Sequence, residues 1–486
     1  MAPTDDFAFL DATAQADLVR QRKVSPTELV EAAIARAERF QPILNCFTTT
    51  RFDSARHEAA TTSIDGGPFA GVPTAMKDLA LNVAGEPCHA GSRAVRALDL
   101  RPARSSHHYE RFRRAGLISL GRTNTPEFGN TITTEPLSYG PARNPWNPGH
   151  STGGSSGGAA AAVAAGIVPV AHATDGGGSI RIPASECGLV GLKPTRGRIS
   201  QGPERGEGWA GSTIGHVVTR SVRDCAVLLD ACHGAEPGDP YAAPTPLRPY
   251  VDELGAHQQP LRVGFFAGPT LPGHVVHPEC VAAVDRTVEL LTSLGHRVEA
   301  SYPEALEASE LGNRFVTVLA TGTALDVTAI ELVLGREATS DDFEAENLFY
   351  AAVGKATTAV EYLTAVQYLH AYQRRMAMWW ASASDGGQAF DVLVTPTIAQ
   401  PPPPIGWMGD PTVAPGWRVR MLLQYTSQFN VTGQPAISLP LHWTPDGLPV
   451  GVQFVGGFGR EDVLLRLASQ LETAAPWADR RPSVHA

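Results

Sequence analysis

Two glycine-rich loops, each carrying a serine, constrain this chain more than any other part of its sequence. The first loop, GGSSGG, contains Ser155, and the second, DGGGSIR, contains Ser179. The residues between them favour a helix over 158–165 and then a strand over 167–173. A helix and a strand joined by a tight turn can bring both loops to one end of a sheet. The pattern therefore predicts a site built around the two serines.

Three consecutive glycines stand directly before the second serine. Gly176, Gly177 and Gly178 have no side chain, so the backbone there can adopt positive φ. Successive N–H groups can then point at one spot and bind a negative oxygen. A hydroxyl directly after such a loop is placed to attack a carbonyl whose oxygen the loop holds.

A lysine lies in an uncharged segment well before these loops. Lys77 ends the run GVPTAMK and precedes the apolar residues 79–83, so a strand that places it near the interior is plausible. Most isolated lysines are solvated surface residues. Burial changes this, because desolvation lowers the pKa of the amine, and a neutral amine can act as a general base.

Other chemistries compete for the same residues. The run GGSSG matches the GxSxG nucleophile elbow, but the preceding NPWNPGHST reads as coil rather than as the required apolar strand. Pro194, which follows Lys193, excludes a P-loop, because that turn must continue into a helix. The glycines could also be purely structural. His150 and His172 are expected to be structural, although the pattern leaves a histidine base open.

The same residues resemble the amidase signature family. The resemblance is carried by GGSSGGAAAAVAAGIVPVAHATDGGGSIRIPASECGLVGLKPTRGRIS and GVPTAMKDL, and by RTNTPEFG, ARNPWNPG, VLVTPT and FNVTGQPAISLP, so it covers nearly the whole chain. It implies that Lys77, Ser155 and Ser179 form a Ser–cisSer–Lys triad in which the Gly154–Ser155 peptide is cis. No metal or other cofactor is implied.

The resemblance also assigns roles to the second loop. It implies an oxyanion hole made by the N–H groups of Gly176, Gly177, Gly178 and Ser179. Asp175 and Arg181 match positions that would brace the loop. Two residues depart from the family pattern, Ala173 where glycine is usual and Gly176 where a bulkier residue is common. Both keep the backbone donors, and the extra glycine is expected to loosen the loop or widen the pocket.

Bulk properties restrict the partners and the compartment. The net charge of −10 disfavours nucleic acid and anionic membranes. Six cysteines without a CxxC pair indicate reduced thiols in a cytoplasmic protein. The acidic start is not typical of a secretory signal, and we expect no apolar stretch long enough to span a membrane. A small-molecule amide is the expected partner, and the sequence leaves a homodimer open.

The resemblance implies an α/β fold: a single large domain, 1–486, with a mixed central β-sheet covered by helices. Its catalytic core should lie in about 65–230 and a helical substrate-pocket region in about 300–385. The expected reaction is amide hydrolysis through an acyl-enzyme. Aryl acylamidase, carbamate or ester hydrolase activity, a glutaminase subunit of an amidotransferase complex, and a non-catalytic binding module are the alternatives. Substrate choice is expected in 200–216, 310–380 and 400–430, whose large side chains suggest an apolar acyl pocket: Trp209, Phe315, Phe349, Tyr350, Trp407, Trp417, Met421 and Tyr425.

Overall fold

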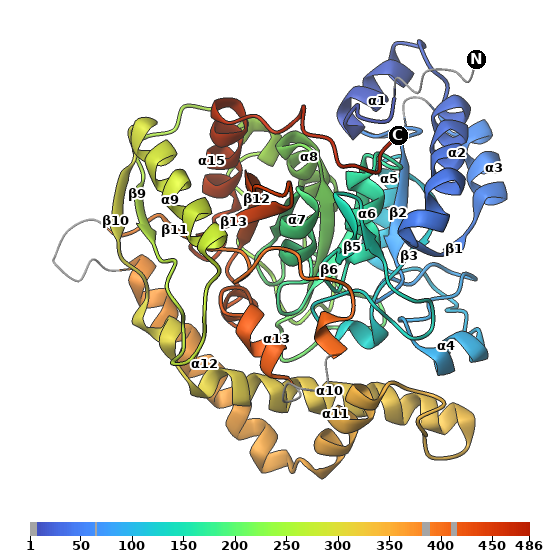
Figure 1. Cartoon of the computed structure of the whole chain (residues 1–486). Coiled ribbons are helices and arrows are strands. Elements are labelled where there is room, and N and C mark those ends of the chain that lie inside the picture. The colour runs from blue at the N-terminus through green and yellow to red at the C-terminus, as the bar shows by residue number, and fades with distance from the viewer. Residues whose placement is uncertain (1–6, 64–65, 382–388, 410–415) are drawn as a thin grey trace.

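A mixed sheet of 11 strands, in the order β1-β3-β2-β6-β8-β7-β12-β13-β11-β9-β10, forms the centre of the molecule (Figure 1). This computed structural model describes residues 7–63, 66–381, 389–409 and 416–486. The strands are β1 (Phe47–Thr50), β2 (Pro73–Lys77), β3 (Ile118–Thr123), β6 (Val170–Asp175), β7 (Val190–Lys193), β8 (Ile214–Thr219), β9 (Arg262–Phe265), β10 (Arg297–Ala300), β11 (Val392–Pro396), β12 (Ala436–Trp443) and β13 (Pro449–Gly456). Parallel and antiparallel neighbours both occur, which confirms the expected α/β fold with a mixed sheet.

Helices cover the sheet and extend from one end of it. They are α1 (Ala12–Arg20), α2 (Pro26–Leu44), α3 (Phe52–Thr61), α4 (Arg93–Leu98), α5 (His107–Arg114), α6 (Gly157–Ala164), α7 (Arg181–Cys187), α8 (Val222–Cys232), α9 (Pro278–Ser293), α10 (Glu310–Leu334), α11 (Ala345–Ala356), α12 (Ala359–Ala381), α13 (Trp417–Leu422), α14 (Ser427–Val431) and α15 (Glu461–Ala474). Short 3-10 turns are η1 (Glu127–Gly129), η2 (Tyr250–Glu253), η3 (Glu304–Glu307) and η4 (Trp407–Gly409).

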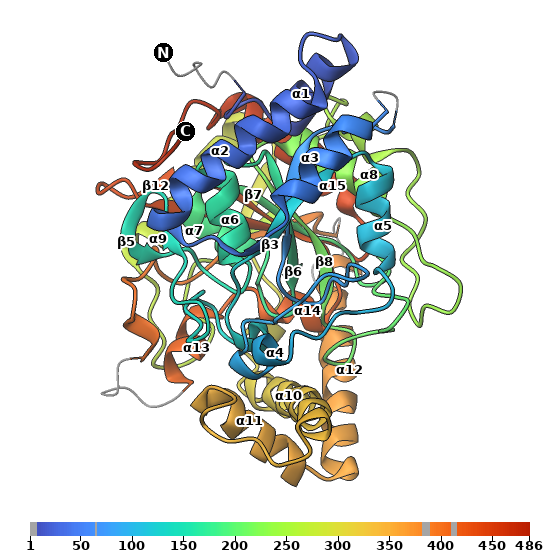
Figure 2. The ribbon, with the colours of Figure 1, turned by 90° about the vertical axis from the view of Figure 1, so that its right-hand side faces the viewer.

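Alternating side chains of the central strands pack on opposite faces of the sheet. On β6, Val170 joins one apolar cluster, which contains residues of α5, α8 and α15, whereas Ala171 joins another, which contains residues of α2, α6 and α7. Val217 and Val218 of β8 divide in the same way. Figure 2 shows α2 and α6 on one side of these strands and α5 and α8 on the other. This alternation follows from the two-residue period of a strand.

The start of α2 follows the local rules of helix capping. Ser25 accepts a hydrogen bond from the N–H of Glu28, and the Glu28 carboxylate accepts one from the N–H of Ser25. Pro26 occupies the first turn. Such a reciprocal capping box satisfies backbone donors that the helix itself leaves free.

The register of two neighbouring strands positions the candidate site. β2 and β6 are parallel, with Thr74 opposite Val170 and Ala75 opposite Ala171. Both strands therefore end at the same edge of the sheet, where Lys77 is the last residue of β2 and Asp175 the last of β6. The loop that carries the three glycines and Ser179 starts at this edge and leads into α7.

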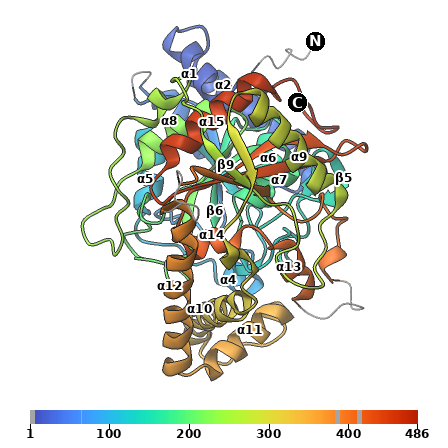
Figure 3. The same cartoon turned by 90° about the vertical axis from the view of Figure 1, so that its left-hand side faces the viewer.

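The helices α10, α11 and α12 project away from the sheet, as Figures 1 and 3 both show. By length and composition alone, α10 is long and apolar enough to cross a membrane, because a stretch of 18 of its residues has a mean hydropathy of 1.6. The sequence-based expectation that no such stretch exists is therefore wrong. In this structure, α10 packs against α11 and α12, and its Leu311, Phe315 and Val318 contribute to an apolar cluster with Leu369 and Met376 of α12.

The segment before Ser155 also differs from expectation. The run NPWNPGHST is predicted as coil, but this part of the chain contains a two-stranded ribbon of β4 (Arg143–Asn144) and β5 (Asn147–Ser151). Asn144 stabilises the ribbon, because its buried side-chain amide donates to the carbonyl oxygen of Ser151 at 2.8 Å. β5 is a polar strand outside the main sheet, so the apolar strand typical of a nucleophile elbow does not precede Ser155.

Candidate active site

The amine of Lys77 is buried at the end of β2 and contacts two hydroxyl groups. Lys77 is 0% exposed, and its Nζ lies 2.7 Å from Ser155 Oγ and 2.8 Å from Thr174 Oγ1. Burial lowers the pKa of the Lys77 amine to about 7, although the charge of Asp175 opposes this shift. Near neutral pH a large fraction of the amine is therefore neutral, and it can accept a proton through Ser155.

Close backbone packing fixes the loop that carries Ser155. The Gly154–Ser155 peptide is cis. A Cβ atom on Gly154 would lie 2.5 Å from the carbonyl oxygen of Thr133, so only glycine fits there. Gly157 is similarly confined, because its Cβ would lie 2.1 Å from Thr152 Oγ1. These contacts hold the hydroxyl of Ser155 against Lys77.

Ser179 lines a cavity of about 130 Å³. Ser155 and Lys77 are buried, whereas Ser179 is partly exposed. Within the described part of the chain, no hydrogen bond joins the hydroxyls of Ser155 and Ser179. The structure therefore brings Lys77 and Ser155 into contact and opens Ser179 to the cavity, and a proton relay needs the Ser179 hydroxyl to turn toward Ser155.

The glycine loop provides fewer free donors than the sequence suggested. The N–H of Gly178 donates to Asp175 Oδ1 at 2.7 Å, so it is not available to bind an oxyanion in this structure. Gly178 has φ of +138°, but Gly176 and Gly177 do not adopt positive φ. Gly177 and Ser179 line the cavity and are the better-placed candidates. A Cβ on Gly176 would lie 2.7 Å from the Trp209 ring, so the room that this glycine leaves is filled by an indole.

A buried ion pair joins Asp175 and Arg181 at the glycine loop. Arg181 donates through Nε and Nη2 to the carboxylate of Asp175, at 3.0 and 2.9 Å, and both side chains are fully buried. Burial alone would raise the pKa of Asp175, but the charge and hydrogen bonds of Arg181 hold it below its usual value. Asp175 also accepts from the N–H groups of Gly178 and Ile180, so it fixes the course of the loop.

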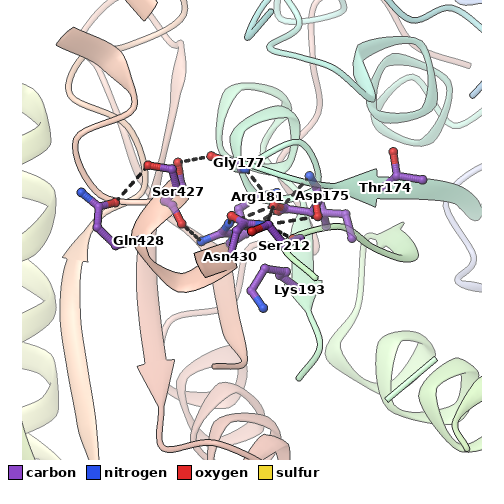
Figure 4. Close-up of polar contacts among 12 residues, drawn as sticks. Thr174, Asp175, Gly177, Arg181, Lys193, Ser212, Ser427, Gln428 and Asn430 are labelled. Carbon is purple, nitrogen blue, oxygen red and sulfur yellow. Dashed lines mark hydrogen bonds and ion pairs between the residues drawn. The ribbon is translucent and has the colours of Figure 1, made fainter. Parts of the chain in front are cut away.

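Residues from the C-terminal part of the chain complete this network, and sequence reasoning gave them no role. Asn430 of α14 donates to Asp175 Oδ1 at 2.8 Å and accepts from Arg181 Nη2 at 2.6 Å (Figure 4). Gln453 of β13 accepts from Arg181 Nη1 at 2.7 Å. Thr426 donates to the carbonyl oxygen of Gly177 at 2.6 Å. The segment FNVTGQP, which includes Asn430, was the available signal. Thr174, the second partner of Lys77, was also missed, although it directly precedes Asp175.

The expected set of large side chains only partly lines the cavity. Trp209, Phe315 and Tyr350 line it, together with Leu306, Leu311, Leu319, Val419 and Leu423. Trp209 and Phe315 meet edge to face with their ring centroids 6.1 Å apart. Tyr425 is instead fully buried in an apolar cluster, and Phe349 is 61% exposed. Neither Trp407 nor Met421 lines the cavity, and the side chain of Trp417 lies outside the described residues.

The two histidines do not take the place of the lysine. His172 is 1% exposed and packs against His108 and Phe112, and burial lowers its pKa well below the usual value. Neither His172 nor His150 forms a hydrogen bond to Ser155 or Ser179 in the described ranges. Among those residues, no group of three His, Cys, Asp or Glu side chains could hold a metal ion.

Comparison with known proteins identifies the family of this chain. The model of the Amidase family matches residues 28–465, and the chain therefore belongs to the amidase family. It is a hydrolase that acts on carbon–nitrogen bonds of amides. The 6-aminohexanoate-cyclic-dimer hydrolase of Paenarthrobacter ureafaciens is 41% identical over 487 residues, which cover 98% of this chain and 96% of that enzyme.

Solved structures extend the likeness to three dimensions. The structure of 6-aminohexanoate cyclic dimer hydrolase complexed with substrate superimposes with a TM-score of 0.93 at 40% identity, covering 99% of this chain and 100% of that one. A bacterial aryl acylamidase of the amidase signature family superimposes with a TM-score of 0.87 at 27% identity, covering 97% of each chain. These likenesses confirm the expected single-domain amidase signature fold.

Proposed function

We propose that this enzyme hydrolyses an apolar carboxylic amide through an acyl-enzyme on Ser179. The observation that carries the proposal is the buried amine of Lys77, whose Nζ lies 2.7 Å from Ser155 Oγ. Ser155 relays the proton, and Lys77 is the general base. This assignment explains why two serine loops and an interior lysine occur together.

The proposed reaction has two halves. Ser179 Oγ adds to the carbonyl carbon while its proton passes to Ser155 and the proton of Ser155 passes to Lys77. The N–H groups of Gly177 and Ser179 are the proposed donors to the oxyanion, with Gly176 as the third candidate. Collapse of the adduct breaks the C–N bond, and the departing amine takes the proton back through Ser155. Water then repeats the sequence and releases the carboxylic acid.

The proposed substrate is the 6-aminohexanoate cyclic dimer or a similar apolar amide. Two observations support it: the apolar lining of the cavity and the likeness to hydrolases of that dimer. The edge-to-face pair of Trp209 and Phe315 makes an aryl amide the second candidate, because aromatic walls favour aromatic ligands. We place the enzyme in the cytoplasm, since all six cysteines are free thiols.

A hydrolysis panel tests the substrate class. The purified protein is incubated with the cyclic and the linear 6-aminohexanoate dimers, an anilide, a fatty amide, a carbamate, an ester and glutamine, and the released amine, alcohol or ammonia is measured. We expect apolar amides to be turned over with a kcat/KM at least tenfold above that for glutamine. Ammonia release from glutamine without hydrolysis of any apolar amide would favour the glutaminase alternative. A fluorophosphonate probe should label Ser179, which a non-catalytic binding module would not allow.

The pH profile tests the proposed role of Lys77. Because its pKa is lowered to about 7, the neutral base form dominates above this pH and is lost below it. We expect kcat/KM to rise about tenfold per pH unit below pH 7 and to level off above it, since this ratio reports groups of the free enzyme. A rate that falls as the pH rises through 7 would contradict a neutral lysine as the base.

A further inference from the structure

A second cavity, of about 240 Å³, lies between the two ends of the described chain. Its lining includes Phe9 and Asp11 near the N-terminus and Trp477, Arg480 and Arg481 near the C-terminus. The two ends are held together there, since the rings of Phe9 and His485 meet with centroids 5.7 Å apart. Figure 2 shows both ends on the same side of the molecule.

The charge of this cavity is opposite in sign to that of the whole chain. Four arginines line it, Arg220, Arg223, Arg480 and Arg481, against two carboxylates, Asp11 and Glu472. The difference, four minus two, gives a local charge of +2 on a chain whose net charge is −10. Asp11 is already neutralised, because Arg223 donates to it through Nε and Nη2 at 2.5 and 2.6 Å.

The other three arginines lack a carboxylate partner. In the part of the chain that the structure describes, Arg220, Arg480 and Arg481 form no ion pair. Arg220 donates only to backbone carbonyls, those of Leu10, Val163 and Val168, at 2.7, 3.0 and 3.2 Å. These three bonds hold the guanidinium in place without neutralising it.

Aromatic contacts orient the two exposed arginines. Arg481 lies over the ring of Phe9 at 4.0 Å, and Arg480 lies over the ring of Trp443 at 4.5 Å. A guanidinium stacked on a ring keeps its N–H donors in the plane of the group, where they can meet a carboxylate side by side. The cavity therefore presents oriented guanidinium donors that form no ion pair in the described part of the chain.

The walls of the cavity are partly apolar. The indole N–H of Trp146 donates to the carbonyl of Cys187 at 2.8 Å, and that of Trp477 donates to the carbonyl of Arg220 at 2.9 Å. With these polar atoms occupied, the two indoles and Phe9 offer hydrocarbon surface to a ligand. A ligand that matches both parts of the lining carries an anionic group and an apolar body.

We propose that this cavity binds a small organic carboxylate, with the carboxylate against Arg220, Arg480 and Arg481 and the apolar body against the aromatic walls. The cavity is distinct from the one at Ser179. α7 separates them: its first residue, Arg181, braces the catalytic loop, whereas its last, Cys187, and the next, Gly188, line this cavity. Seven helical residues span about 10 Å.

Calorimetric titration with benzoate and hexanoate tests the proposal on the full-length protein. The test variant is the double substitution Arg480→Gln and Arg481→Gln, in which both side chains are exposed, so the fold should persist. The control is Arg113→Gln with Arg114→Gln, another adjacent and exposed pair outside the cavity. We expect the test variant to bind both carboxylates at least tenfold more weakly and the control to match the parent protein.

Two further ligands test separately whether the charge and the apolar body are each needed for binding. Benzyl alcohol, which lacks the charge, and inorganic phosphate, which lacks the apolar body, should each bind at least tenfold more weakly than benzoate. Equal benzoate affinity in the test variant would show that the carboxylate binds elsewhere, for example at Ser179, and would overturn the proposal. Phosphate binding as tight as benzoate binding, or no binding of either carboxylate, would also overturn it.

Discussion

Ser179→Ala is expected to lower kcat/KM for an apolar amide by a factor on the order of 10⁵ while the protein remains folded. The substitution removes the proposed nucleophile, and Ser155 cannot replace it, because its hydroxyl is buried against Lys77. In other serine hydrolases, removal of a nucleophile that acts together with its base lowers kcat by several orders of magnitude. Ser179 is partly exposed to the cavity and forms no hydrogen bond within the described residues, so its loss should leave the melting temperature nearly unchanged.

Ser185→Ala is the matched control, for which we expect a loss of stability rather than a loss of activity. Ser185 lies on α7, and its hydroxyl accepts a hydrogen bond from the N–H of Gly451 at 2.8 Å. The substitution leaves that buried donor without an acceptor, which costs about 1–3 kcal/mol of stability. We expect a lower melting temperature but a kcat/KM within a few-fold of the parent. Activity retained by Ser179→Ala in steady-state assays would refute the assigned nucleophile.

Lys77→Met is expected to lower kcat/KM by a factor of about 10⁴. Methionine fills a similar volume but cannot accept the proton that Ser155 relays, so the attack by Ser179 loses its base. The effect should persist at high pH, because no amine remains to be deprotonated. Lys77→Ala should be similarly inactive, and a near-normal rate for either variant would remove Lys77 from the scheme.

The chain contains a close control for this lysine. Lys193 is also buried, and its pKa is also lowered to about 7, by burial and by the nearby charge of Arg181. Its Nζ donates to the carbonyl of Pro194 at 2.8 Å, and no hydrogen bond to a serine is found among the described residues. We expect Lys193→Met to retain kcat/KM within about tenfold. If Lys77→Met and Lys193→Met lowered kcat/KM equally, the loss would come from disturbed folding around a buried lysine rather than from a missing proton acceptor.

The sequence by itself determined many of the local elements and indicated the candidate catalytic groups, whose roles remain predictions. The run PTAMK made a strand with Lys77 near the interior plausible, although most isolated lysines are exposed, and β2 does bury Lys77. The reciprocal capping box of Ser25 and Glu28 at the start of α2 also depends only on residues close together in the sequence. The serine–glycine loops could be recognised in the sequence itself, whereas the bracing role of Asp175 and Arg181 came from the family resemblance. The family could be recognised from the sequence because its motifs are short and local.

Only the tertiary structure decided how these groups meet. The parallel register of β2 and β6 brings Lys77 beside Thr174, and no local pattern specifies which strands become neighbours. Asn430, far along the chain, completes the brace around Asp175. The carboxylate of Asp175 also accepts a hydrogen bond from the N–H of Gly178, so the loop has fewer free N–H donors than its three glycines suggest. Long-range contacts of this kind depend on how the whole sheet packs, and a sequence pattern describes only neighbours along the chain.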